Sequence, residues 1–297
     1  MLRGPGCALI ALGLSGCWAG SAVAAPKATW LGSYVWTEHS PRVAGLSGFD
    51  TDTAGTAFMA VGDIGTLVTG RLLRDADGRV RGVAADPLGI LRDGDGRRLG
   101  GDRHDAEGLA ILPEGGFAVS FEQIHRIVTY AGPGALPAEA GTGLDIGGLD
   151  WNGGYEALAA QSDGTLYALP ERVGVLDATI PVRILQDGRW RRFATIPKDG
   201  FWRPVGADFG PDGRLYLLER DFWGFLGFMS RIRRFEMTSS GLAGGEVLYA
   251  STAGIHDNLE GIAAWQDAEG RTRLTMVSDN NLRAQQRTEF ADFLVSE

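Results

Sequence analysis

Cysteine is nearly absent from this chain, which contains only Cys7 and Cys17 among its 297 residues. Both lie near the N-terminus, so the body of the protein has no disulfide framework and its stability must come from packing. An excess of basic residues is also lacking, because the formal net charge is −9. Nucleic acid is therefore not expected as a partner, since phosphate backbones are bound by basic faces.

Familiar catalytic motifs are missing as well. The sequence has no Gly-x-Ser-x-Gly elbow, no Walker loop, no His-Glu-x-x-His and no cysteine-based metal site. No stretch shows the apolar period of an amphipathic helix. The apolar run near the N-terminus is shorter than the roughly 20 residues that a membrane span requires. We therefore expect no transmembrane span in the mature chain and no organic cofactor.

The first 25 residues have the layout of a secretory signal peptide. Arg3 gives a basic start, Cys7–Gly16 is apolar, and Ala22–Ala24 has the small-x-small pattern of a cleavage site. Alternatively, Leu14–Cys17 resembles the lipobox of bacterial lipoproteins, in which Cys17 would carry a lipid anchor. Either alternative predicts export, as a periplasmic or secreted protein or as an outer-membrane lipoprotein.

One motif recurs along the rest of the chain. DAEGLAIL at Asp105–Leu112 and NLEGIAAW at Asn258–Trp265 are close copies, and GYEALAAQ at Gly154–Gln161 keeps the glutamate. Two further copies, PVGADFGP and GLSGFDTD, lose it. The five aligned positions are Ser47, Glu107, Glu156, Val205 and Glu260, and subtracting their numbers gives spacings of 60, 49, 49 and 55. A unit of about 50 residues indicates a repeat fold such as a propeller.

Each repeat continues with an Asp-Gly or Gly-rich turn and a second apolar run, which is typical of antiparallel hairpins. About four short strands fit in each unit, the content of one propeller blade. Residues 26–297 are therefore predicted to form one all-β propeller domain. Five blades are visible, and six are expected if residues 86–105 or 131–152 hide further strands. The lone strand Thr29–Glu38 is predicted to complete the last blade and close the ring.

Two sets of acids could carry chemistry. Glu107, Glu156 and Glu260 begin the first strand of a repeat, and Asp208 is a weaker addition. The second set ends the next strand and contains Asp63, Glu122, Glu171, Glu219 and Asp279. Converging carboxylates suit Ca²⁺ or another divalent cation. The alternatives are that the first set accepts backbone N–H groups of the next blade or acts directly in catalysis, and that the second set forms repeated ion pairs.

Basic and aromatic residues accompany these acids. Arg126, Arg172, Arg220 and Arg287 follow members of the second set, and arginine can hold a phosphate or carboxylate in a forked geometry. His39, His104, His125 and His256 lie near the repeats, where a histidine can be a base or a metal ligand. The aromatic insertion within Arg220–Glu236 is expected to be a hairpin tip or plug between blades, with a lid over the channel mouth as the alternative.

At these motifs the chain resembles the bacterial family called phytase-like, or esterase-like activity of phytase. The matching stretches are GLSGFD, DAEGLAILPEGGFAVSFEQIHRIVTY, the Glu-Ala-Leu-Ala copy, DFGPDGRLYLLERDF, and DNLEGIAAWQDAEGRTRLTMVSDNN with QQRTEF. The resemblance covers about residues 44–295. It implies an exported β-propeller that hydrolyses phosphoesters or esters with a divalent metal. Ser47 and Val205 depart from the glutamate of the pattern, so the acid ring is incomplete.

The resulting hypothesis is a monomeric hydrolase of the cell envelope acting on a small anionic or ester substrate. Glu107, Glu156, Glu260 and Asp208 would hold the cation, which polarises a phosphoryl or acyl oxygen and activates water. Two alternatives stay open: a non-catalytic propeller that binds a ligand or an envelope partner, and a lactonase-type propeller enzyme. The remaining predicted site residues are His125, Glu122 and Asp279 for catalysis and Arg126 and Arg287 for substrate binding.

Overall fold

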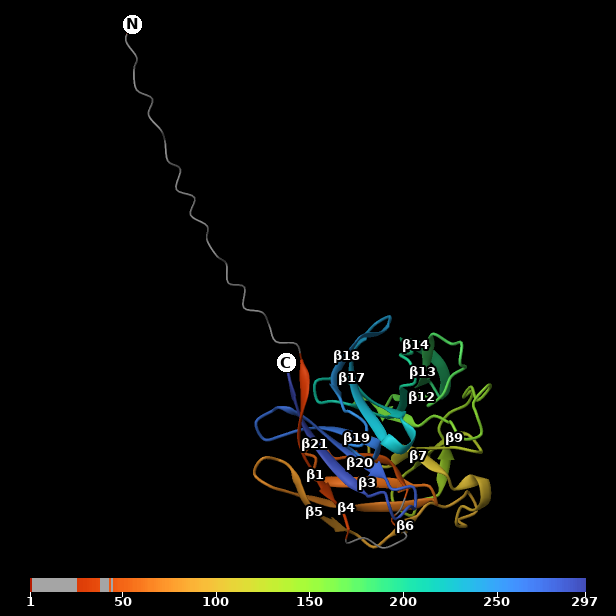
Figure 1. The fold of residues 1–297 in the computed structure, drawn as a ribbon. Coiled ribbons are helices and arrows are strands. Elements are labelled where there is room, and N and C mark those ends of the chain that lie inside the picture. The colour runs from red at the N-terminus through yellow and green to blue at the C-terminus, as the bar shows by residue number, and fades with distance from the viewer. Residues whose placement is uncertain (2–25, 38–42, 44) are drawn as a thin grey trace.

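The computed structural model describes residue 1, residues 26–37, residue 43 and residues 45–297. Five antiparallel sheets are arranged around a central axis (Figure 1). The predicted five-bladed, all-β propeller is therefore confirmed. The predicted export signal, the lipobox with Cys17, and His39 lie outside the described residues. Within the described residues no helix is long and apolar enough to cross a membrane.

Each blade is a meander whose first strand lies innermost. Blade 1 contains β2 (Leu46–Thr51), β3 (Ala57–Gly62), β4 (Thr66–Arg74), β5 (Val80–Ala85) and the two-residue β6 (Gly89–Ile90). Blade 2 contains β7 (Ala106–Ile111), β8 (Phe117–Phe121), β9 (Arg126–Tyr130) and β10 (Pro137–Glu139). Blade 3 contains β11 (Ala157–Ala160), β12 (Leu166–Leu169), β13 (Thr179–Gln186) and β14 (Arg189–Pro197).

The last two blades have the same plan. Blade 4 contains β15 (Arg203–Phe209), β16 (Leu215–Phe222), β17 (Phe228–Thr238) and β18 (Gly241–Ala250). Blade 5 contains β19 (Asn258–Gln266), β20 (Thr272–Asp279), β21 (Glu289–Ser296) and β1 (Lys27–Val35). No sixth sheet is found in the described chain, because residues 86–105 supply β6 and a short 3₁₀ turn, and residues 131–152 supply the edge strand β10.

The N-terminal strand closes the ring, as the sequence predicts. β1 pairs antiparallel with β21, from Lys27 opposite Ser296 to Val35 opposite Glu289. The first described strand and the last strand therefore lie side by side (Figure 1). This pairing covers the edge of β21, which would otherwise present unpaired N–H and C=O groups.

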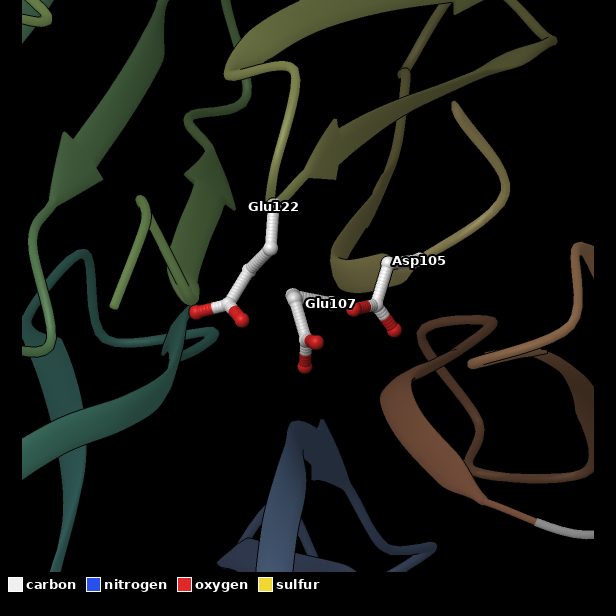
Figure 2. Close-up of side chains that lie close together, drawn as sticks. All are labelled: Asp105, Glu107 and Glu122. Atoms are coloured by element: carbon white, nitrogen blue, oxygen red, sulfur yellow. The ribbon is translucent and has the colours of Figure 1, made fainter. Parts of the chain in front are cut away.

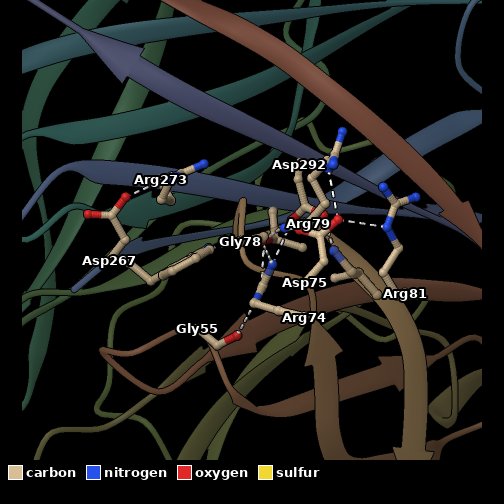
Figure 3. A network of polar contacts seen from close by, with 12 residues as sticks. Gly55, Arg74, Asp75, Gly78, Arg79, Arg81, Asp267, Arg273 and Asp292 are labelled. Atoms are coloured by element: carbon tan, nitrogen blue, oxygen red, sulfur yellow. Dashed lines mark hydrogen bonds and ion pairs between the residues drawn. The ribbon is translucent and has the colours of Figure 1, made fainter. Parts of the chain in front are cut away.

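A buried ion pair also joins the first and last blades. Arg74 on β4 contacts Asp292 on β21 at 2.8 Å, and both side chains are almost fully buried (Figure 3). The second carboxylate oxygen of Asp292 accepts the backbone N–H of Val80 at 2.7 Å. The Arg74 guanidinium lies 4.2 Å from the ring centre of Trp265. Because these contacts join blade 1 to blade 5, they stabilise ring closure.

Small residues let the innermost strands approach one another closely. A Cβ added to Gly108 would lie 2.4 Å from the carbonyl oxygen of Glu156 in the next blade. A Cβ added to Gly48 would lie 2.5 Å from the carbonyl oxygen of Glu107, and one added to Gly206 would lie 2.3 Å from that of Glu260. The central channel is consequently almost filled, with a cavity of only about 10 Å³. A ligand of the size of an ester must therefore bind at a mouth of the ring.

Candidate active site

Antiparallel pairing brings the two sequence-predicted sets of acids to the same end of the ring. The start of each innermost strand lies beside the end of the second strand, as Asn258 opposite Asp279 illustrates. In blade 2 the N–H of Glu122 likewise bonds to the carbonyl of Asp105 at 2.9 Å. The residues of both sets therefore surround one mouth of the channel.

A β-bulge coincides with the aligned repeat position in four blades. The register of the innermost strand shifts by one residue at Ser47, Val205 and Glu260, and also within Ala106–Leu109, which contains Glu107. A bulge adds one residue to one strand and re-aims a side chain. The repeated glutamate thus occupies a position that is specialised in backbone as well as in sequence.

The register corrects one sequence-based assignment. In each blade, the residue two positions before the repeat position stands opposite a residue of the second strand. This partner is Asp279 in blade 5 and Arg220 in blade 4. Glu219 is one residue out of this register, so its side chain points to the other face. Its carboxylate forms buried ion pairs with Arg231 at 2.7 Å and Arg233 at 2.6 Å. Blade 4 therefore contributes an arginine, not an acid, to the second ring.

Carboxylate oxygens converge in two overlapping groups. Asp105, Glu107 and Glu122 offer oxygens that all lie within 4.8 Å of one another, and Glu122, Glu156 and Glu171 do the same. Figure 2 shows Glu107 between Asp105 and Glu122. Glu122 belongs to both groups. Hard oxygen ligands at such separations suit a divalent cation such as Ca²⁺.

Burial raises the pKa values of several acids at the mouth. Burial raises the pKa of Asp63 to about 7, and the charges of Glu260 and Asp105 add to this effect. The pKa of Glu122 is likewise raised to about 7 by burial. Glu107 has its pKa raised well above the usual value by burial and by its acidic neighbours. We call the eight residues Asp63, Asp105, Glu107, Glu122, Glu156, Glu171, Glu260 and Asp279 the mouth cluster.

Arg220 is the cation placed among these acids. Its guanidinium bonds to Glu260, to Asn258 at 2.7 Å and to Glu171 at 3.1 Å. Burial alone would lower the pKa of Arg220, but the charges of Glu260 and Glu156 raise it above its ordinary value. Glu171 also contacts Arg172 at 2.6 Å and Arg203 at 3.3 Å. These arginines gather on one side of the cluster.

A pocket of about 640 Å³ opens on that side. Four arginines and one acid give it charged walls: Arg172, Arg203, Arg220, Arg283 and Asp221. Its aromatic walls come from Phe201, Phe222, Trp223 and Phe228. Asn258 also lines it and donates to Glu260 at 2.9 Å and to Asp279 at 3.3 Å. The arginine pocket, as we call it, therefore adjoins the mouth cluster directly.

Some predicted site residues lie elsewhere. Asp208 is three residues beyond the repeat position, about 10 Å along the strand, and its carboxylate accepts the N–H of Ala264 at 2.6 Å. Its pKa is raised by burial and by Asp50, not by the mouth cluster. Arg126 bonds to backbone carbonyls and covers the ring of Phe121. Arg287 is paired with Glu289 at 2.8 Å. The structure therefore groups none of these three side chains with the predicted glutamates.

The histidines have different environments. His256 is buried and contacts Glu289 at 3.1 Å, and His104 bonds to the carbonyl of Asp63 at 2.6 Å. His125 Nε2 lies 3.0 Å from the carbonyl oxygen of Asp150, so this nitrogen must carry the hydrogen. Its Nδ1 is buried without a hydrogen-bond partner in the described chain and lies beside Gly154, whose N–H bonds to Glu122.

Sequence patterns did not single out three of the residues at the site. Asp105 stands in the repeat itself, two residues before Glu107, and Asn258 occupies the same position before Glu260. Their shared position two residues before the glutamate could have identified both residues as members of the site, because both belong to the recurring motif. Arg203, two residues before Val205, has the same position in blade 4.

Comparison with known proteins adds the family. The model of the family described as phytase-like, esterase-like activity of phytase, matches residues 41–282. The chain belongs to this family. No curated protein matches the sequence of this phytase-like propeller.

Solved structures resemble it at low identity. A calcium-binding regucalcin from Agrobacterium tumefaciens has 10% identity and a TM-score of 0.47, covering 85% of this chain and 91% of that one. A gluconolactonase from Xanthomonas campestris has 15% identity and a TM-score of 0.43, covering 84% and 86%. A luciferin-regenerating enzyme has 12% identity and a TM-score of 0.47, covering 88% and 95%.

Proposed function

We propose that this phytase-like propeller hydrolyses small anionic esters, with phosphomonoesters as the substrate class, and that it works with a divalent cation. The observation that supports this function is the contact between two unlike surfaces. The mouth cluster offers converging carboxylates, and the arginine pocket beside it offers guanidinium groups. A cation site next to an anion site is the arrangement that phosphoryl or acyl transfer to water requires.

The residues present fit a divalent cation. Glu122 shares one group with Asp105 and Glu107 and another with Glu156 and Glu171, and all five supply oxygen ligands. No side-chain hydrogen bond links the Glu107 carboxylate to another residue of the described chain, so it can offer an oxygen as a ligand. A cation bound there would supply Lewis-acid polarisation of the ester oxygen.

The arginine pocket would hold the anion. Arg220 is fixed by Glu171 and Glu260, and Arg203 is fixed by Glu171, so their guanidinium groups are oriented before a substrate arrives. Preorganised donors cost little when charge develops in the transition state. These arginines replace Arg126 and Arg287 of the sequence-based hypothesis as the proposed substrate-binding groups.

Proton transfer is assigned to His125. Its Nε2–H is committed to the carbonyl of Asp150, and its Nδ1 has no partner among the described residues. The imidazole ring of His125 and the side chain of Glu122 both lie beside Gly154. We also propose export from the cytoplasm, with residues 1–25 as the signal or Cys17 as a lipid attachment site.

The test is turnover of a phosphomonoester panel with and without EDTA and added Ca²⁺, Mg²⁺ or Mn²⁺. Glu122→Gln should lose cation binding measured by calorimetry and lower kcat by about 100-fold or more. Glu114→Gln is the matched control. Glu114 is exposed on the turn after β7, at the opposite end of that strand from Glu107, and its replacement should change neither cation binding nor kcat. Turnover that survives EDTA and Glu122→Gln would contradict the proposal. Ligand binding with no turnover of any ester would favour a non-catalytic propeller.

A further inference from the structure

An aromatic hairpin projects beside the arginine pocket. β16 and β17 are joined by the 3₁₀ turn Gly224–Leu226, which is the aromatic insertion of the sequence. Phe222 is 60% exposed and Trp223 is 54% exposed. The indole N–H of Trp223 donates to Asp221 at 2.9 Å, and the rings of Phe222 and Phe228 lie 4.8 Å apart. The insertion is therefore a hairpin tip with ordered rings, not a plug between blades.

These rings line the pocket without being covered. Phe222, Trp223 and Phe228 form part of the wall of the 640 Å³ pocket, and the 79% exposed Phe201 forms another part. Exposed aromatic side chains gathered in one pocket are typical of ligand sites, since soluble proteins rarely leave such surface open. The same pocket is lined by guanidinium groups, and the one carboxylate in its lining, Asp221, accepts the indole N–H of Trp223. A ligand that satisfies both walls must have an anionic end and a flat apolar end.

We propose that the pocket selects anionic esters whose alcohol part is an aromatic ring. This inference rests on the proposed function and specifies its substrate class. The anionic group lies on Arg220 and Arg283, toward the mouth cluster, and the ring lies against Trp223 and Phe222. Aromatic rings favour edge-to-face or offset contacts with one another, which an aryl group provides and a polyol does not. Arg220 lies 5.8 Å from the ring centre of Phe228, so the charged and aromatic walls are continuous.

Polyol phosphates fit this pocket poorly. Every phosphate group of a polyol phosphate is charged, and its carbon skeleton carries an oxygen on each carbon. Such a ligand offers no apolar surface to the aromatic wall, which would stay in contact with water. The mouth cluster also repels additional phosphate groups that extend beyond the arginines. We therefore expect a monoanionic or dianionic aryl ester to be preferred over a sugar or inositol polyphosphate.

The experiment measures binding of non-hydrolysable probes to the whole protein by calorimetry. Phenylphosphonate should bind about tenfold more tightly than methylphosphonate, because a ring contact is added to the same anion. Trp223→Ala should remove most of that advantage and leave methylphosphonate binding unchanged. Trp223→Phe should restore about half of it. Phe225→Ala is the matched control on the same hairpin, since Phe225 is 97% exposed and does not line the pocket. It should behave like wild type.

Each outcome separates this inference from the proposed function. Equal binding of phenylphosphonate and methylphosphonate would overturn the aryl site even if phosphomonoesters are turned over. Hexylphosphonate binding as tightly as phenylphosphonate would also overturn it, because the wall would then recognise any apolar chain. A Trp223-dependent preference for phenylphosphonate with no turnover of phosphomonoesters would support the aryl site and remove the hydrolase.

Discussion

At the scale of single residues, buried acids divide into two kinds. Asp50 and Asp208 lie toward the hairpin end of the innermost strands, and each accepts a backbone N–H from the next blade. The donors are Ile111 at 2.7 Å and Ala264 at 2.6 Å. Accepting a backbone N–H group from the next blade was one role considered for the repeated glutamates. In the structure Asp50 and Asp208 have this role, and Glu122 has it through the N–H of Gly154.

Asp50 and Asp208 make stability depend on pH. Burial raises the pKa of Asp50 to about 7, and burial with the charge of Asp50 raises that of Asp208 well above its usual value. A pKa that folding raises gives stability that is complete below the unfolded pKa of about 4 and is lost as the pH rises through about 7. The free energy of unfolding should therefore decline over this window.

Asp208→Asn should make that decline in the free energy of unfolding shallower, because one of the two interacting charges is removed. The amide oxygen can still accept the N–H of Ala264. Urea unfolding at pH 5 and pH 8 measures the difference. Glu114→Gln removes an exposed charge and should show the wild-type slope. An identical slope in Asp208→Asn would mean that Asp208 is ionised throughout the window.

At the scale of elements, the bulged innermost strand explains why the motif repeats. In blades 2 and 5 the glutamate lies within the bulge, and the small residue after it lets the next blade approach. The sequence repeat revealed the glutamate and the small residue, because they recur at similar spacing, whereas strand pairing revealed the bulge. It placed blade 4 one residue out of register, because Glu219 and Arg220 are adjacent and only strand pairing shows which of them stands opposite Arg203.

Gly108→Ala tests the close approach of neighbouring blades. Its Cβ would meet the carbonyl oxygen of Glu156 at 2.4 Å, and a backbone atom cannot rotate away. We expect a loss of about 1–3 kcal/mol of stability and weaker cation binding. Gly132→Ala is the control, since nothing lies within 4 Å of the added carbon and its backbone is not left-handed. Thermal or urea unfolding of both variants decides the point, and equal stability would show that the blades can separate without cost.

At the scale of the whole molecule, closure of the ring decides stability. The N-terminal strand β1 pairs with the last strand within blade 5, and the Arg74–Asp292 ion pair joins blade 5 to blade 1. The lone strand and the short last repeat were visible in the sequence, so this closure could be predicted. The ion pair could not, because its partners are 218 residues apart and lie outside the repeated motifs.

Asp292→Ala should cost about 3–5 kcal/mol, because it leaves Arg74 buried without its carboxylate. Asp95→Ala breaks an exposed ion pair with Arg97 and should cost less than about 1 kcal/mol. Urea unfolding compares the two variants. A small effect of Asp292→Ala would mean that the contacts of Arg74 with Gly55, Gly78 and Thr275 are sufficient for closure.

The sequence by itself determined the propeller, the closing strand and the family, because each depends on local pattern repeated at a regular spacing. It left the number of blades at five or six, and strand pairing fixed it at five. It also found most of the mouth cluster, since the repeat places every glutamate at the same end of its strand. Only the tertiary structure decided the register of Arg220, the separation of Asp208 and the arginine pocket. These depend on which residues of different blades face one another, and such pairings between distant residues have no fixed spacing along the chain.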